Sequence, residues 1–130
     1  MLRIAIVEDN DTDREIITDA LGRFETEENE HFSITEFHDA MDFLEQRKMD
    51  FQMVFMDIQM PVMDGYDAAA RIRRMKDEKK ASIPIIAMTA NAFEEDAKKC
   101  LAAGMNAHLA KPLDIGKLIA TIAQYKAKEK

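Results

Sequence analysis

Short apolar runs alternate with longer amphipathic segments along this chain of 130 residues. The runs cover residues 2–7, 32–37, 51–56, 83–88 and 106–110. The first, third and fourth are almost entirely apolar, which is typical of strands buried on both faces of a parallel sheet. The second run alternates more and favours a strand at the edge of the sheet. The pattern therefore predicts five strands.

The segments between these runs repeat apolar residues at helical spacing. Thr12 and Glu15 have the spacing of a capping box and predict the start of the first helix. A second helix is expected at 40–47, a third from Asp64-Gly65 and a fifth capped by Asp114. Apolar residues recur at helical spacing in four of these helices, and those of the third and fifth are expected to face inward. They are Ile16, Ile17, Ala20, Leu21 and Phe24 in the first, Ala68, Ala69, Ile72 and Met75 in the third, Phe93, Ala97, Cys100 and Leu101 in the fourth, and Leu118, Ile119, Ile122 and Tyr125 in the fifth.

Strand and helix follow each other five times, with Gly104 ending the fourth helix. This alternation predicts an α/β fold, in which helices joined by right-handed crossovers cover both faces of a parallel sheet. A flavodoxin-like, doubly wound sheet in the order 2-1-3-4-5 with five helices is the natural arrangement. We expect one domain over 1–126, a frayed tail at 127–130 and polar surface loops at 25–31 and 76–82.

Composition narrows the class of protein. Apolar residues make up 47% and charged residues 33%, and no apolar run reaches the length of a membrane span, which favours a soluble protein. The first residues do not resemble a secretory signal, so a cytoplasmic location is expected. The single cysteine, Cys100, excludes an intrachain disulfide and a cysteine-based zinc site. A net charge of −7 without a basic cluster argues against direct nucleic-acid binding.

Reactive side chains follow the strands at their carboxyl ends, where open α/β sheets bind ligands. Glu8 and Asp9 follow the first run, Asp57 the third, Thr89 the fourth and Lys111 the fifth. Two carboxylates about 5 Å apart repel by roughly 3 kcal/mol at an effective dielectric constant near 20. One lysine does not balance three acids, so the cluster calls for a cation. Oxygen ligands without histidine or cysteine select a hard ion, Mg²⁺ first and Mn²⁺ as an alternative.

Four motifs carry a resemblance to a known family: IVEDN at 6–10, VFMDIQMPVMDG at 54–65, IIAMTA at 85–90 and HLAKP at 108–112. In this order and spacing they resemble the receiver domain of two-component response regulators over essentially the whole chain. The amino-acid sequence of residues 87–112 is most similar to the receivers of hybrid histidine kinases. The resemblance implies a phosphorelay switch that is not an enzyme, beyond assisting its own phosphorylation and slow dephosphorylation.

The resemblance also implies roles for individual residues. Asp57 corresponds to the phosphoacceptor, which takes a phosphoryl group from a phosphohistidine in a Mg²⁺-dependent reaction. Glu8 and Asp9 correspond to the acidic pair that holds Mg²⁺ with Asp57, and the backbone carbonyl of Gln59 is a further ligand. Thr89 corresponds to the switch hydroxyl.

Near the last strand, Lys111 corresponds to the phosphate-binding lysine, and Pro112 to a structural proline that usually follows a cis bond. His108 departs from the family, which often has tyrosine or phenylalanine at this switch position. Two interpretations of His108 stay open: its ring switches position as the aromatic residue does, or it is a half-exposed histidine without a role in switching. The expected output surface is the face made by the fourth helix, the fifth strand and the fifth helix.

The implied partners are a sensor histidine kinase or a histidine phosphotransfer protein, and an output domain or effector. Neither a membrane nor nucleic acid is expected as a direct partner, and the choice between a monomer and a homodimer stays open. Two other functions fit the sequence less well. A haloacid dehalogenase-like phosphohydrolase needs a second acid where Gln59 stands. A flavin or nucleotide module needs a phosphate loop where residues 8–13 read EDNDTD, which repels phosphate.

Overall fold

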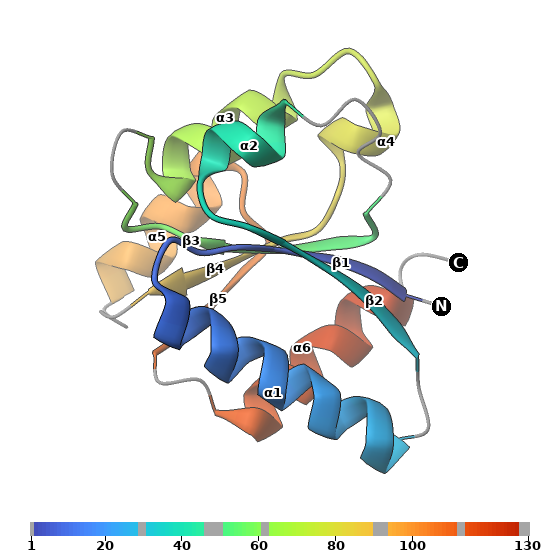
Figure 1. Cartoon of the computed structure of the whole chain (residues 1–130). Helices are drawn as coiled ribbons and strands as arrows, with labels where there is room; N and C mark the ends of the chain where they lie inside the picture. Colours follow the sequence, from blue (N-terminus) through green and yellow to red (C-terminus); the bar gives the residue numbers. More distant parts are fainter. Residues whose placement is uncertain are drawn as a thin grey trace.

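A single parallel sheet forms the centre of the molecule (Figure 1). The computed structural model describes residues 2–28, 31–45, 51–60, 63–89, 94–111 and 114–127. The strands are β1 (Leu2–Val7), β2 (Phe32–Phe37), β3 (Met53–Asp57), β4 (Ile85–Thr89) and β5 (Ala107–Ala110). Their order is β2-β1-β3-β4-β5 and every neighbouring pair is parallel, so the predicted flavodoxin-like topology is confirmed.

Helices cover both faces of this sheet. They are α1 (Asp11–Glu28), α2 (Ala40–Leu44), α3 (Gly65–Arg73), α4 (Glu78–Ala81), α5 (Glu94–Ala103) and α6 (Ile115–Ala127). Figure 1 shows α1 and α6 on one face, with α2, α3 and α4 on the other. Buried side chains of α5 share the core of α2 and α3, whereas α1 and α6 share a second core across the sheet. Within the described residues, no helix is long and apolar enough to cross a membrane.

The short helix α4 corrects the expected number of five helices. It lies in 76–82, where a surface loop was predicted, and none of its residues is buried. The carboxylate of Asp77 accepts hydrogen bonds from the backbone N–H groups of Lys79 and Lys80 at 2.9 and 3.4 Å. A capping aspartate is enough to form one solvated turn without an apolar stripe. The fourth and fifth predicted helices are therefore α5 and α6.

Helix ends follow local hydrogen-bonding chemistry. The predicted capping box at Thr12 is wrong, because Asn10 Oδ1 accepts the backbone N–H of Asp13 at 3.0 Å and α1 begins one residue earlier. At its other end α1 runs to Glu28, through part of the loop predicted at 25–31. The predicted caps Asp64 and Asp114 are confirmed, since each accepts a backbone N–H three residues ahead, at 2.9 and 3.0 Å.

Two residues of the apolar helical patterns do not face the core. The stripe of α1 that faces the core starts at Ile17, which leaves Ile16 44% exposed about 100° away around the helix. On α5, Cys100 takes the buried position and the next residue, Leu101, is 65% exposed. Phe93 lies outside the described residues, as do 46–47 of the second predicted helix and 128–130 of the predicted tail.

Arg73, the last residue of α3, binds several backbone and side-chain groups at the end of the sheet opposite to Asp57. Its Nε donates to the Gly104 carbonyl at 2.7 Å, and its Nη2 donates to Asn106 Oδ1 at 2.8 Å. Its Nη1 donates to the carbonyls of Ala81 and Ile83, both at 2.8 Å. The planar guanidinium group therefore joins α3 to the ends of α4 and α5 and to the start of β4 and β5.

Gly104 and Asn106 contribute further to this network of hydrogen bonds. Gly104 has φ of 100°, and a Cβ atom there would lie 2.7 Å from Arg73 Cγ, so glycine is needed on both counts. Asn106 Oδ1 accepts the Ile85 N–H at 2.9 Å, and the Asn106 carbonyl accepts the Tyr125 hydroxyl at 2.9 Å. The turn from α5 to β5 is thereby tied to β4 and α6 as well.

We expect Arg73→Lys to lower the free energy of unfolding by about 2 kcal/mol. A lysine ammonium cannot reach the four acceptors that the guanidinium fork serves, so partly buried carbonyls lose their partners. Urea unfolding followed by circular dichroism measures this change. Arg71→Lys on the same helix, at an exposed position, is the matched control and should stay within about 0.5 kcal/mol of wild type. Equal losses in both variants would contradict the role of Arg73.

Candidate functional site

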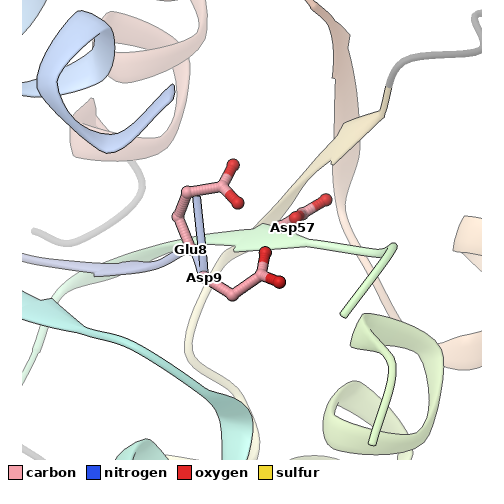
Figure 2. Close-up of side chains that lie close together, drawn as sticks. All are labelled: Glu8, Asp9 and Asp57. Atoms are coloured by element: carbon pink, nitrogen blue, oxygen red, sulfur yellow. The ribbon is translucent and has the colours of Figure 1, made fainter. Parts of the chain in front are cut away.

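Three carboxylates gather where β1 and β3 end. Glu8 and Asp9 follow β1, and Asp57 is the last residue of β3 (Figure 2). One carboxylate oxygen from each residue lies within 4.8 Å of the others. Glu8 and Asp57 are 0% and 3% exposed, whereas Asp9 is exposed to solvent. The parallel register of the two strands brings the acids together at one edge, as the sequence predicted.

Lys111 and Thr89 reach the same edge from the other side. The Lys111 N–H donates to the Thr89 carbonyl at 2.7 Å just beyond the ends of β4 and β5. The Lys111 ammonium group forms an ion pair with Glu8, and its Nζ atom lies 3.5 Å from Asp57 Oδ2. Thr89 is buried and lies one residue beyond Met88, the register partner of Asp57. The structure thus brings together the side chains of Glu8, Asp9, Asp57 and Lys111, and it places Thr89 at the neighbouring strand end.

Burial and the close approach of charged groups shift two pKa values in the cluster. Burial, together with hydrogen bonding to Asp57, raises the pKa of Glu8 to about 8, although Lys111 opposes the shift. Burial lowers the pKa of Lys111, but its contacts with Glu8, Asp57 and Asp13 outweigh burial and leave the pKa above its ordinary value. Without a cation, Glu8 is therefore harder to ionise than an ordinary glutamate, although Lys111 lies beside it.

The backbone around Asp57 is held by the start of α3. Asp57 Oδ1 accepts the Gln59 N–H at 3.1 Å, so the backbone of Gln59 lies beside the cluster. The Gly65 N–H donates to the Ile58 carbonyl at 3.2 Å. A Cβ atom at Gly65 would lie 2.6 Å from the Asp57 carbonyl oxygen, so only glycine lets the helix approach this closely.

Two residues of the site were missed in the sequence. Asp13 Oδ2 lies 3.2 Å from Lys111 Nζ. The buried Arg14 donates from Nη1 to the Glu8 carbonyl at 2.9 Å and pairs with Asp11. Both lie in the first turn of α1, directly after the acidic pair. A helix start at Asn10 would have turned them toward the site, whereas the expected capping box at Thr12 hid them.

The other predicted residues lie away from the acids or outside the description. His108 is half-buried in β5, opposite Ala87 in the register with β4. Pro112 lies outside the described residues, and so does its predicted cis bond. Cys100, the single cysteine of the chain, is buried in α5, as expected.

The acidic cluster suits a hard divalent cation. Its possible donor set is carboxylate oxygen alone, without histidine or cysteine in the group of Glu8, Asp9 and Asp57. Such donors prefer Mg²⁺ or Mn²⁺ to zinc or copper. The exposed position of Asp9 leaves the cluster open to solvent on one side, where a metal ion would retain water. The donors present therefore fit magnesium.

The model of the response regulator receiver domain family matches residues 4–123. The chain belongs to this family. The predicted resemblance is confirmed, and the match covers every residue of the cluster. The receiver domain is a signalling module of two-component systems, and its fold is that of a switch domain.

Relatives and solved structures agree with this assignment. The chain is 36% identical over 127 residues to hybrid signal transduction histidine kinase L of Dictyostelium discoideum, which covers 95% of this chain and 7% of that protein. The chain spans between 4% and 12% of the length of the curated relatives that it matches. These relatives are histidine kinases, as the wording of residues 87–112 predicted.

The receiver domain of sensor histidine kinase PA1611 from Pseudomonas aeruginosa, solved with a magnesium ion in its active site cleft, superposes with a TM-score of 0.78. It is 32% identical, and the match covers 95% of this chain and 96% of that one. The receiver domain of Saccharomyces cerevisiae Ssk1, in complex with the phosphotransfer protein Ypd1, gives a TM-score of 0.79 at 25% identity, covering 98% and 90% of the two chains.

The raised pKa of Glu8 predicts a pH dependence of stability in the absence of divalent ions. The folded state binds a proton on Glu8 up to about pH 8, whereas the unfolded chain releases it near its ordinary value of 4.5. Stability should therefore fall as pH rises from about 5 to 8. Urea unfolding at pH 6 and pH 8 in a chelator measures this fall. Glu8→Gln should flatten it, whereas Glu15→Gln, at an exposed position, should preserve it. A wild-type slope retained in Glu8→Gln would refute the assignment.

Proposed function

We propose that this chain is a phosphorelay switch in which Asp57 accepts a phosphoryl group from a phosphohistidine. The observation that supports it most is the buried Asp57 carboxylate, held beside Glu8, Asp9 and the Lys111 ammonium group. A cluster of three carboxylates, two of them buried, beside one ammonium group is costly unless it has a function there. The magnesium ion in the PA1611 receiver is consistent with the same use of this cluster.

In the proposed transfer, an oxygen of Asp57 attacks phosphorus and the bond from phosphorus to the histidine nitrogen breaks. The electron pair of that bond returns to the imidazole ring. Lys111 donates to one phosphoryl oxygen and Thr89 to another, which balances charge that develops during transfer. Glu8 and Asp9, with Asp57 and the Gln59 carbonyl, would hold Mg²⁺ or, alternatively, Mn²⁺. When bound, this ion supplies positive charge against the phosphoryl oxygens.

The proposal does not extend to turnover of external substrates. The segment Asp57-Ile58-Gln59 has no acid two residues after the nucleophile, where an aspartate phosphohydrolase would need one. We therefore expect Asp57 to be phosphorylated and to lose its phosphate slowly.

The proposed output is a change in the face made by α5, β5 and α6. Thr89 ends β4 and pairs with Ala110 of β5, so a phosphoryl group that draws the Thr89 hydroxyl toward it would also act on β5. His108 of β5 is the candidate for the side chain that moves together with Thr89. Moving a switch from 1:99 to 99:1 needs about 5.5 kcal/mol of differential binding. A hydrogen bond to a charged group contributes about 1.5–3 kcal/mol, so partner binding must complete the shift.

The proposed phosphodonor is a sensor histidine kinase or a histidine phosphotransfer protein in the cytoplasm. The Ypd1 complex of the Ssk1 receiver, on the same fold, supports the second of these for this chain. The α5–β5–α6 face is proposed for an output domain, an effector protein or a second copy of the chain.

Phosphorylation tests the proposal directly. Incubation with a small acyl phosphate and Mg²⁺ should add one phosphoryl group to the wild type by intact mass, and none to Asp57→Asn. Asp19→Asn, at an exposed position of α1, removes the same charge and should leave the adduct in place. An adduct that persists in Asp57→Asn would refute Asp57 as the acceptor. The same conclusion would follow if the wild type binds Mg²⁺ but gains no adduct even from a phosphorylated phosphotransfer protein.

Magnesium binding tests the acidic pair separately. Asp9→Asn should weaken Mg²⁺ binding at least about tenfold, because a carboxylate ligand and its charge are lost. Calorimetric titration measures the affinity, with Asp11→Asn in the first turn of α1 as the control that removes a nearby charge. Equal weakening in both variants would show that Asp9 acts only through net charge.

A further inference from the structure

The ammonium group of Lys111 is surrounded by carboxylates. Glu8 forms an ion pair with it, and its Nζ atom lies 3.2 Å from Asp13 Oδ2 and 3.5 Å from Asp57 Oδ2. Glu8 and Asp13 accept hydrogen bonds from the ammonium group, whereas the longer contact with Asp57 is an ion pair. A phosphoryl oxygen on Asp57 must draw the ammonium group away from these two hydrogen-bond partners to bind it closely.

Burial decides which contact gives way. The Glu8 side chain is 0% exposed, so no water replaces the lysine if that ion pair opens. Asp57 carries the phosphoryl group itself, so its contact passes to that group. The Asp13 side chain is 37% exposed, and water can solvate its carboxylate once Lys111 turns away. Asp13 is therefore the partner that Lys111 loses at least cost.

Asp13 is also held firmly enough to compete. Its backbone N–H is bound to Asn10 Oδ1 at 3.0 Å, which fixes it in the first turn of α1. Lys111 comes from the end of β5, 98 residues further along the chain, so this pair joins α1 to β5. The carboxylate of Asp13 draws the ammonium group away from the incoming phosphoryl group and adds a negative charge near it. Both effects disfavour the phosphorylated state.

We propose that Asp13 is a positioning residue that competes with the phosphoryl group for Lys111 and limits how strongly the site holds it. The inference rests on the proposed function. It assigns to the first turn of α1 a part in setting how far the switch moves when Asp57 is phosphorylated. Receivers that differ at this position would then differ in the affinity of an otherwise equal site.

Trifluoroberyllate, a tetrahedral analogue of the phosphoryl group, tests this at saturating Mg²⁺. Asp13→Asn should bind it about twofold to fivefold more tightly than wild type in a calorimetric titration, the range expected for one partly exposed ion pair. Asp11→Asn removes the same charge in the same turn, but Asp11 pairs with Arg14, so its affinity should stay at the wild-type value. Asp13→Glu keeps the carboxylate and should return the affinity toward wild type.

Tighter binding is a result that simple damage to the fold does not produce, and urea unfolding of each variant checks the fold independently. Unchanged or weaker binding by Asp13→Asn would overturn the inference, and so would equal tightening in Asp11→Asn. A wild type that binds Mg²⁺ but neither trifluoroberyllate nor a phosphoryl group would instead overturn the proposed function, and this inference with it.

Discussion

The constraint on which the rest of the structure depends is the crowding of acids around one lysine. Glu8, Asp9 and Asp57 have carboxylate oxygens within 4.8 Å of one another, and Lys111 is the ammonium group among them. Each pair of charges at about 5 Å costs roughly 3 kcal/mol at an effective dielectric constant near 20. The raised pKa of Glu8, the preference for a hard cation and the proposed affinity for a phosphoryl group all follow from this crowding of acids in a buried site.

The scaffold withstands that repulsion because backbone hydrogen bonds position the site. The parallel registers of β1, β3, β4 and β5 place the strand ends side by side, and the close approach at Gly65 packs α3 against the Asp57 backbone. At the opposite end of the strands, Arg73 and Asn106 tie α3, α4, α5 and α6 to β4 and β5. The acids sit on a rigid frame, so their charges act on ligands rather than pushing the strands apart.

Sheet order and strand-end chemistry were predictable because buried parallel strands leave nearly continuous apolar runs, and their carboxyl ends must share one edge. The positions of helix ends were not predictable, because neighbouring polar side chains compete to cap them. Asn10 and Thr12 are both good caps, and only the contact made by Asn10 decides where α1 starts. That one choice also turned Asp13 and Arg14 toward the site. Likewise α4 has no apolar stripe, so a pattern of burial cannot indicate it, and Leu101 and Cys100 look alike until packing against α3 selects one.

The ion pair between Glu8 and Lys111 joins residues separated by 103 positions, from the first strand of the sheet to just past the last. Contacts of such long range form late, because closing the loop between them costs entropy that only the assembled sheet repays. During synthesis, the Asp57 carboxylate is complete long before Lys111 leaves the ribosome. A growing or misfolded chain therefore carries Asp57 without this lysine, and the proposed competence to accept a phosphoryl group arises only when the whole domain has folded.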